Sequence, residues 1–251
     1  MHGPSRNAGP LAAAEVAARA AAGPERFMTP ADYEAWYDSP RGQWIGATEH
    51  ALLRRLLRPE RGASLLDVGC GTGHFTRLFA RDVQGPVVGI DPNEASLAYA
   101  RARACDGECY AAARAEALPF ADRCFDYALS VTALCFVGDQ KQALSELLRV
   151  TKKRFVLGLL HRRSLLYLQK GRGAGAGAYA GAHWHTAGEV RELLAGLPAG
   201  QVVLRTAIVL PQATPFAQAL ESRWPGRARV GGFLAVAGEV VERPVKAPAR
   251  S

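Results

Sequence analysis

Short apolar runs of strand length alternate with amphipathic stretches of helix length from about residue 64 onward. This alternation predicts right-handed βαβ crossovers, in which a mostly parallel sheet carries helices on both faces. We therefore expect an α/β, doubly wound fold with a seven-stranded sheet. The pattern places strands at 64–68, 86–91, 109–113, 125–131, 154–160, 202–210 and 232–241, and helices at 74–82, 94–103, 140–150 and 187–197.

The ends of the chain differ from this middle part. Residues 1–26 are rich in Ala, Gly and Pro and are expected to form a flexible leader, and residues 243–251 a flexible tail. Between them we expect a single domain over 27–242. It would consist of an aromatic lid and helix over 27–60, followed by a Rossmann-like core over 64–242.

Two further segments have a recognisable local pattern. In the aromatic part, Thr48 is placed to cap a helix that runs to about Arg58, where Pro59 stops it. The stretch 171–181, GRGAGAGAYAG, is low in complexity and is expected to be a mobile loop.

Composition narrows the class of protein. The chain has 251 residues, 49% hydrophobic and 22% charged, which excludes a mainly disordered polymer. It contains no run of about 18 apolar residues that would cross a membrane, and its N-terminal stretch lacks the apolar core of a signal peptide. The five cysteines show no zinc-like spacing. We therefore expect a cytoplasmic protein with reduced thiols and no metal.

The net charge of +8 is concentrated in one stretch, 149–172, which has many Lys and Arg residues and no Asp or Glu. Such a stretch is either a patch for an anionic substrate or nucleic acid, or an ordinary solvated surface. Aromatic residues do not interleave with these charges as a single-strand binding platform would require.

The most specific pattern is the turn that follows the first apolar run. Glycines stand at alternate positions, 69, 71 and 73, between a strand and a helix, where the backbone can pass close to a ligand. A dinucleotide-binding turn would have its third glycine one residue later, where this chain has His74. Asp67 would repel a pyrophosphate but would suit a ligand with a cationic amino group.

A second carboxylate, Asp91, follows the second apolar run, 18 residues after Gly73. At the tip of the second strand it is placed to accept hydrogen bonds from both ribose hydroxyls of a nucleoside. The alternative is that Asp91-Pro92-Asn93 only caps the next helix.

In these residues and the segments around them, the chain resembles the class I S-adenosylmethionine-dependent methyltransferases of the type 11 group. The resemblance lies in LLDVGCGTGHFT (65–76), VVGIDPNEASLAYAR (87–101), ARAEALPFADRCFDYALSVTALCFV (113–137) and ALSELLRV (143–150). It implies the Rossmann-like methyltransferase fold, with the last strand antiparallel, and S-adenosyl-L-methionine as the cofactor.

The resemblance also implies roles for individual residues. The glycine turn with Asp67 would line the methionine part of the cofactor, Asp91 would hold the ribose, and Ser130 would border the cofactor. The adenine would lie beside Pro92, Ala115 and Glu116, although Arg114 replaces the Asp that the family often has before the Ala-Glu pair. The cofactor-binding residues expected are Asp67, Gly69, Cys70, Gly71, Gly73, Asp91, Pro92, Ala115, Glu116 and Ser130.

Direct methyl transfer needs an attacking atom held in line and shielded from water, and a base only if that atom must lose a proton. The catalytic residues therefore stay unknown, with His161 and Tyr37 as weak candidates. Aromatic faces attract a sulfonium, so Tyr33, Trp36 and Tyr37 are expected to form a lid, unless they are ordinary core. Trp184, between two histidines, either contacts substrate or anchors its loop.

These observations favour a methyltransferase that acts on a small-molecule acceptor. The alternatives are methylation of RNA or protein through the 149–172 stretch, and a regulatory protein that binds the cofactor without catalysis. Nucleic acid is disfavoured because Ser130-Val131-Thr132-Ala133 replaces the N-P-P-[YF] type of tetrapeptide of base-methylating enzymes. An NAD-binding oxidoreductase is disfavoured by the glycine spacing. We expect no membrane association, and the oligomeric state stays open.

Overall fold

The computed structural model describes residues 29–172, 177–223 and 229–241. The leader expected over 1–26 and the tail expected over 243–251 lie outside the described residues.

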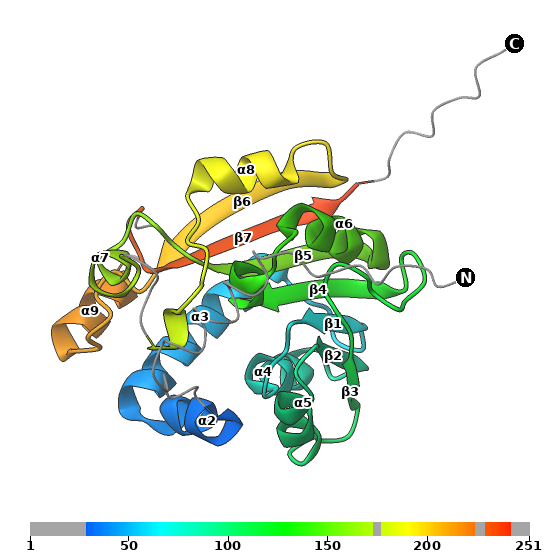
Figure 1. Cartoon of the computed structure of the whole chain (residues 1–251), viewed down its shortest axis with the longest axis horizontal. Coiled ribbons are helices and arrows are strands. Elements are labelled where there is room, and N and C mark those ends of the chain that lie inside the picture. The colour runs from blue at the N-terminus through cyan, green and yellow to red at the C-terminus, as the bar shows by residue number, and fades with distance from the viewer. Residues whose placement is uncertain (1–28, 173–176, 224–228, 242–251) are drawn as a thin grey trace, which may run out of the picture.

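Seven strands in the described part of the chain form one mixed sheet, in the order β3-β2-β1-β4-β5-β7-β6 (Figure 1). Strands β1 to β5 pair in parallel with one another, whereas β7 is antiparallel to both β5 and β6. The expected doubly wound, mostly parallel sheet with an antiparallel last strand is confirmed. The strands are β1 (Leu65–Val68), β2 (Val87–Asp91), β3 (Glu108–Ala112), β4 (Phe125–Val131), β5 (Thr151–Leu160), β6 (Ala199–Ala207) and β7 (Phe233–Val240).

Strand β6 begins and ends earlier than its expected range of 202–210, because the backbone leaves the extended conformation at Ile208, where φ is 62°.

The helices connect and cover these strands. The described helices are α2 (Pro30–Asp38), α3 (Pro40–Leu57), α4 (His74–Val83), α5 (Glu94–Arg101), α6 (Gln140–Val150), α7 (Leu165–Lys170), α8 (Ala187–Leu194) and α9 (Pro215–Arg223), with short 3-10 turns η1 (Ala133–Phe136) and η2 (Gly177–Tyr179).

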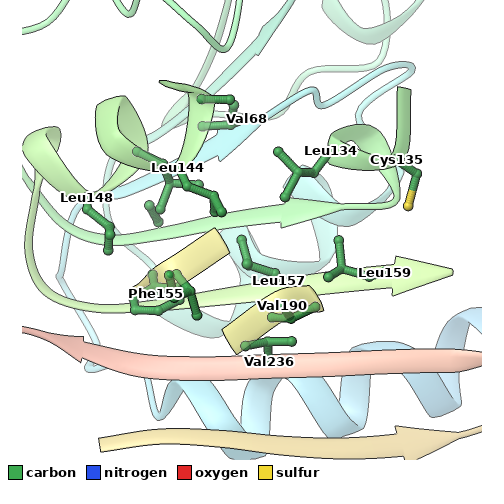
Figure 2. Packing of buried hydrophobic residues seen from close by; sticks show 14 of the residues in the cluster. Val68, Leu134, Cys135, Leu144, Leu148, Phe155, Leu157, Leu159, Val190 and Val236 are labelled. Atoms are coloured by element: carbon green, nitrogen blue, oxygen red, sulfur yellow. The ribbon is translucent and has the colours of Figure 1, made fainter. Parts of the chain in front are cut away.

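The core lies on both faces of the sheet, because successive strand residues point to opposite sides. Val68 and Leu157 pack on the face that α6 and α8 cover (Figure 2). Leu65 and Val156 pack on the other face, against side chains of α3 and α4. This two-sided burial fixes the strand ends at which the site forms.

Helix α3 begins earlier than the sequence pattern suggested, and the prediction that Thr48 caps it was wrong. The cap is Ser39, whose hydroxyl accepts from the Gly42 N–H at 3.0 Å. Pro40 occupies the first helical position, where a missing N–H leaves no bond unmade. Thr48 lies inside the helix and donates its hydroxyl to the Trp44 carbonyl.

Glycines on α3 let α2 approach closely. A Cβ at Gly42 would lie 1.9 Å from the Trp36 carbonyl oxygen, and one at Gly46 would lie 3.1 Å from the Tyr37 ring. Small residues four apart therefore form the contact surface for α2. This contact places the aromatic residues of α2 beside the carboxyl ends of the strands.

Candidate functional site

A cavity of about 480 Å³ opens at the carboxyl ends of β1, β2 and β4. We call it the first cavity. Gly73 is absent from its lining, but the other residues expected to bind the cofactor all line it. These are Asp67, Gly69, Cys70, Gly71, Asp91, Pro92, Ala115, Glu116 and Ser130.

The glycine turn, residues 69–73, has a backbone that side chains would disturb. Gly69, Gly71 and Gly73 all have positive φ, at 77°, 53° and 82°. A Cβ at Gly69 would lie 2.1 Å from the Cβ of Ala133, whereas Gly71 has open space within 4 Å. Gly73 is the N-cap of α4, and a Cβ there would lie 2.7 Å from the Tyr110 hydroxyl.

Asp91 organises this turn from the end of β2. One of its carboxylate oxygens accepts from the Gly71 N–H at 2.9 Å and the other from the Asn93 N–H at 2.8 Å. Helix α5 is capped by Asn93, which accepts from the Ser96 N–H at 3.1 Å. Capping therefore does not explain Asp91. A carboxylate has about four acceptor positions, so Asp91, which lines the first cavity, can accept further hydrogen bonds.

Asp67 lies at the floor of the first cavity and is 2% exposed. Its Oδ2 accepts from the Thr76 hydroxyl at 2.7 Å. Burial, aided by the negative charge of Asp91, raises the pKa of Asp67 to about 7, although the Thr76 hydrogen bond opposes this shift. A cation in the cavity would favour the charged carboxylate, so the site suits a positively charged group.

Beside the turn, Ala115 and Glu116 line the first cavity. Arg114, where the family often has Asp, lines it too, and its guanidinium pairs with Glu116 at 3.1 Å. No carboxylate therefore stands at position 114 to receive an adenine amino group.

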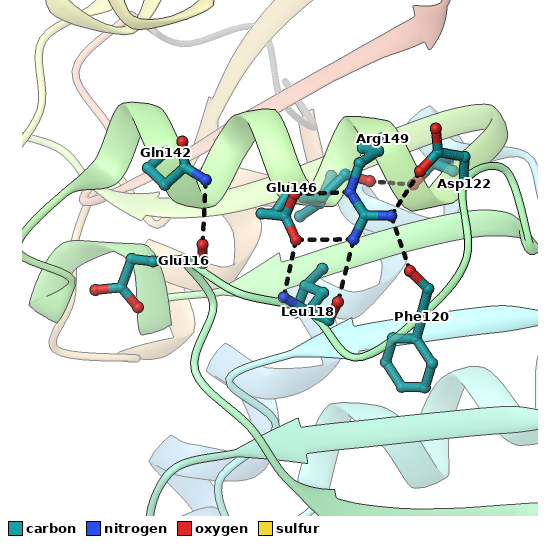
Figure 3. A network of polar contacts seen from close by, with 9 residues as sticks. Glu116, Leu118, Phe120, Asp122, Gln142, Glu146 and Arg149 are labelled. Carbon is teal, nitrogen blue, oxygen red and sulfur yellow. Dashed lines mark hydrogen bonds and ion pairs between the residues drawn. The ribbon is translucent and has the colours of Figure 1, made fainter.

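The segment that follows this wall is held by Arg149 of α6 (Figure 3). Its guanidinium donates to the carbonyls of Leu118 and Phe120 at 3.1 and 2.8 Å, and pairs with Glu146 and Asp122, both at 2.7 Å. Glu146 in turn accepts from the Leu118 N–H at 2.9 Å. Arg149, the first basic residue of the 149–172 stretch, is thus used to build the fold.

Most of the other charges in that stretch are paired as well. Surface pairs contribute little to stability, but they reduce the field that a polyanion would meet. The remaining pairs are Lys152 and Lys153 with Asp126, Lys153 with Glu60, Arg154 with Glu239, and Arg162 with Glu189.

A second cavity, of about 240 Å³, adjoins the first. Both are lined by Tyr33, Thr132 and Phe136, so the two spaces meet at these residues. The expected lid residues Trp36 and Tyr37 line the second cavity. Tyr33 and Tyr37 also lie with their hydroxyl oxygens 3.3 Å apart. The structure therefore brings the predicted lid to a cavity wall.

Sequence reasoning missed several walls of the second cavity. Glu49 and Ile45 of α3 line it, together with Tyr179 of η2 and Phe233 of β7. The spacing of Arg41, Ile45 and Glu49 is the signal that could have indicated a shared helix face. That signal was hidden because the helix was expected to begin at Thr48.

Strain marks the point at which the two cavities meet. Thr132 has φ 57°, in the left-handed region that a β-branched residue rarely adopts. Its N–H donates to the Gly158 carbonyl at 2.7 Å and its hydroxyl to the Val131 carbonyl at 2.8 Å. Such strain persists where the surrounding structure enforces it, and it clusters at functional sites.

The lid helix α2 is fastened to the glycine turn. Glu34 accepts from the Thr72 hydroxyl and forms an ion pair of 2.7 Å with Arg77 of α4. On the same side, the Tyr37 ring stacks on the His74 ring with centroids 3.6 Å apart. Burial, with help from Arg77, lowers the pKa of His74 to about 4. His74 is therefore neutral at physiological pH.

His161 and Trp184 lie elsewhere. His161 is 3% exposed, and its Nδ1 lies 2.9 Å from the Gly231 carbonyl oxygen. Trp184 is 4% exposed and packs edge-on against Tyr167. Neither residue is part of the lining of the two cavities described. The packing favours the interpretation of Trp184 as a loop anchor.

Within residues 29–172, 177–223 and 229–241, no group of three or more His, Cys, Asp or Glu side chains is arranged to hold a metal. In the same ranges, no helix has both the length and the apolar character needed to span a bilayer.

Comparison with known proteins agrees with this geometry. The family model of the methyltransferase domain matches residues 66–157. An uncharacterized protein from Mycobacterium tuberculosis is 35% identical over 213 residues, which cover 82% of this chain and 70% of that protein.

Solved structures share the fold. One is a SAM-dependent methyltransferase from Thermotoga maritima, described as a possible histamine N-methyltransferase. It superposes with a TM-score of 0.65 and 26% sequence identity, and the match covers 83% of this chain and 95% of the Thermotoga chain. Another is geranyl diphosphate C-methyltransferase from Streptomyces coelicolor, solved with Mg²⁺, geranyl diphosphate and S-adenosyl-L-homocysteine. Its TM-score is 0.59 at 17% sequence identity, and the match covers 79% of this chain and 80% of the Streptomyces chain.

Proposed function

Since the chain belongs to the class I S-adenosylmethionine-dependent methyltransferases, we propose that it binds S-adenosylmethionine in the first cavity and methylates a small-molecule acceptor held in the second. The observation that carries this proposal is the junction of the two cavities at Tyr33, Thr132 and Phe136. Molecules that occupied both cavities would meet at this junction, as methyl transfer requires.

The lining of the first cavity fits the parts of the cofactor. Asp67 would hold the cationic amino group of the methionine part, because its buried carboxylate gains from a nearby positive charge. Asp91 would accept from the ribose hydroxyls with the lone pairs that Gly71 and Asn93 leave unused. Open space at Gly71 allows close approach of the ligand to the backbone.

When bound, the cofactor supplies a methyl group that its positive sulfur makes reactive. The chain's task is to hold the attacking atom in line, about 3–3.5 Å from that methyl group, and to exclude water. The rings of Tyr33, Trp36 and Tyr37 would close the second cavity against solvent. Aromatic faces also stabilise positive charge, which the sulfonium carries.

The second cavity favours a small acceptor over a macromolecule. Its volume of about 240 Å³ suits a compact molecule, and its walls are largely aromatic and aliphatic. Ligand cavities for drug-sized molecules are usually about 300–1,000 Å³. The basic 149–172 stretch gives the RNA alternative little support, because most of its charges already have carboxylate partners.

Calorimetric titration with S-adenosylmethionine and S-adenosylhomocysteine tests the first half of the proposal. We expect both to bind, and the absence of heat at millimolar ligand would refute it. Ile45 lines the second cavity but not the first. Ile45→Phe is therefore expected to leave the affinity for S-adenosylhomocysteine unchanged and to abolish methyl transfer to acceptors found by screening.

The alternatives predict different results in the same assays. Salt-sensitive retention of tRNA or rRNA fragments, followed by their methylation, would replace the small-molecule acceptor by RNA. Formation of S-adenosylhomocysteine with any acceptor would exclude a purely regulatory protein.

A further inference from the structure

The second cavity contains one acidic side chain, Glu49. It lies on the face of α3 that Arg41 and Ile45 also present to the cavity, at intervals of four residues. Among the described residues, the Glu49 carboxylate has neither a hydrogen-bond partner nor an ion-pair partner. A carboxylate in a largely apolar cavity is unfavourable unless a ligand satisfies it.

Aromatic rings line the same cavity as this carboxylate. They include Tyr33 and Tyr37 from α2, and Tyr179 from η2. Burial is the main cause that raises the pKa of each of these phenols, and the charge of Glu49 adds to it, which indicates that the three rings lie near Glu49. Trp36 completes the aromatic wall from α2. A negative charge in a cavity lined by aromatic rings is chemistry that recognises an organic ammonium.

We propose that the methyl acceptor is a compact primary or secondary amine, which Glu49 binds as its ammonium and then deprotonates. This inference rests on the proposed function, because it names the acceptor of the same site. The wall of apolar rings favours an amine with a short aromatic or aliphatic body. A cavity of about 240 Å³ leaves room for one or two rings.

The proton balance follows from the chemistry of amines. An ammonium has no lone pair, so Glu49 takes one proton from nitrogen and becomes a neutral carboxylic acid. The freed nitrogen pair forms the new N–C bond while the C–S bond breaks and its electrons remain on sulfur. The products are the methylated ammonium and S-adenosylhomocysteine, and Glu49 returns its proton to solvent when the products leave.

The surroundings of Glu49 suit this exchange. Burial raises the pKa of its carboxyl to about 8, which makes the carboxylate a stronger base than usual and narrows the gap to the pKa of an amine. The ionisable groups that face it are Tyr33 and Tyr37 of α2, Tyr179 of η2 and Arg41, which is exposed. The three phenols keep their protons, because burial raises their pKa values.

Binding of matched probes to the protein saturated with S-adenosylhomocysteine tests the inference. The probes are phenethylamine, the neutral 2-phenylethanol and the anionic phenylacetate, measured by calorimetry. We expect the amine to bind more tightly than the other two. Glu49→Gln should weaken amine binding roughly 30-fold, because it removes the charged partner, and leave the alcohol within about twofold.

Controls separate this inference from the proposed function. Glu192→Gln removes an exposed carboxylate from α8, away from both cavities, and should change none of the affinities. Unchanged affinity for S-adenosylhomocysteine in Glu49→Gln shows that the variant is folded. Two outcomes overturn the amine inference alone, provided that the protein binds S-adenosylhomocysteine. In one, the alcohol binds as tightly as the amine. In the other, the amine does not bind at millimolar concentration. Protein that binds no S-adenosylhomocysteine overturns the proposed function.

The unaltered protein offers a second test if Glu49→Gln does not fold. Amine affinity should rise between pH 6.5 and 8.5 as Glu49 loses its proton, and the affinity for 2-phenylethanol should stay constant. A flat profile for the amine refutes the role of Glu49. With an accepted amine as substrate, kcat/KM should show the same acid limb near pH 8. Glu49→Gln should move this limb up toward the pKa of the free amine, because only the neutral amine can then react.

Discussion

Replacing Asp91 by Asn tests the nucleoside site directly, because the change keeps the shape of the side chain and removes its charge. The carboxylate has about four acceptor positions, of which the N–H groups of Gly71 and Asn93 use two. Two remain for ribose hydroxyls. Hydrogen bonds to a charged group contribute about 1.5–3 kcal/mol each, and the partial exposure of Asp91 favours the lower value.

An amide retains one acceptor oxygen, so Asp91→Asn should lose part of this energy. We expect a loss of about 1.5–3 kcal/mol, a rise of roughly 10- to 150-fold in the Kd for S-adenosylhomocysteine. Calorimetry measures this change without turnover. Asp106→Asn, at an exposed turn outside both cavities, is the control. An unchanged Kd in Asp91→Asn, with Asp106→Asn also unchanged, would show that the ribose does not lie against Asp91.

Three further outcomes follow from the structure. Gly69→Ala places a Cβ 2.1 Å from the Cβ of Ala133 and should lower the melting temperature. Gly62→Ala should lower it less, because Gly62 also has a positive φ but has open space around the added Cβ. Equal effects in calorimetric melts would contradict the clash. Glu34→Gln should weaken S-adenosylhomocysteine binding by about 0.5–1.5 kcal/mol through loss of its contacts to α4 and the turn, and a titration that matches the unaltered protein would argue against that coupling. The pKa of Asp67 in the folded protein lies above its unfolded value, so the free energy of unfolding of the ligand-free protein should fall as pH rises from about 4 to 7. Chemical denaturation across this pH range should show a smaller fall in Asp67→Asn.

The sheet and the first cavity could be predicted because their signals are local. A buried strand, a glycine turn and a helix follow one another within residues 65–83, and the pairing of β1 with β2 brings Asp91 to Gly71. The sequence left open whether Asp91 binds a ribose or whether Asp91-Pro92-Asn93 only caps α5, because Asp and Asn both serve as caps. The structure separates the two roles, since only Asn93 accepts from the first turn of α5.

The second cavity could not be predicted, because it forms from segments far apart in the chain. Residues of α2 and α3 meet η2 and β7 there only after the sheet has folded. Pro40, Gly42 and Gly46 read as helix breakers, yet α3 runs through all of them, because Pro40 stands at its first position and α2 packs closely on the glycines. Glu49 gave no signal of its own, since an isolated Glu on a helix is usually solvated.

The contacts of Glu34 connect the two cavities through helix α2. This helix carries a wall of the second cavity, and Glu34 also contacts Thr72 in the glycine turn and Arg77 in α4. A ligand in one cavity that orders helix α2 lowers the conformational-entropy cost of binding a second ligand in the other cavity. If the proposed donor and acceptor occupy the two cavities, linkage requires that each raises the affinity of the other by the same factor, so the acceptor would bind best after the methyl donor.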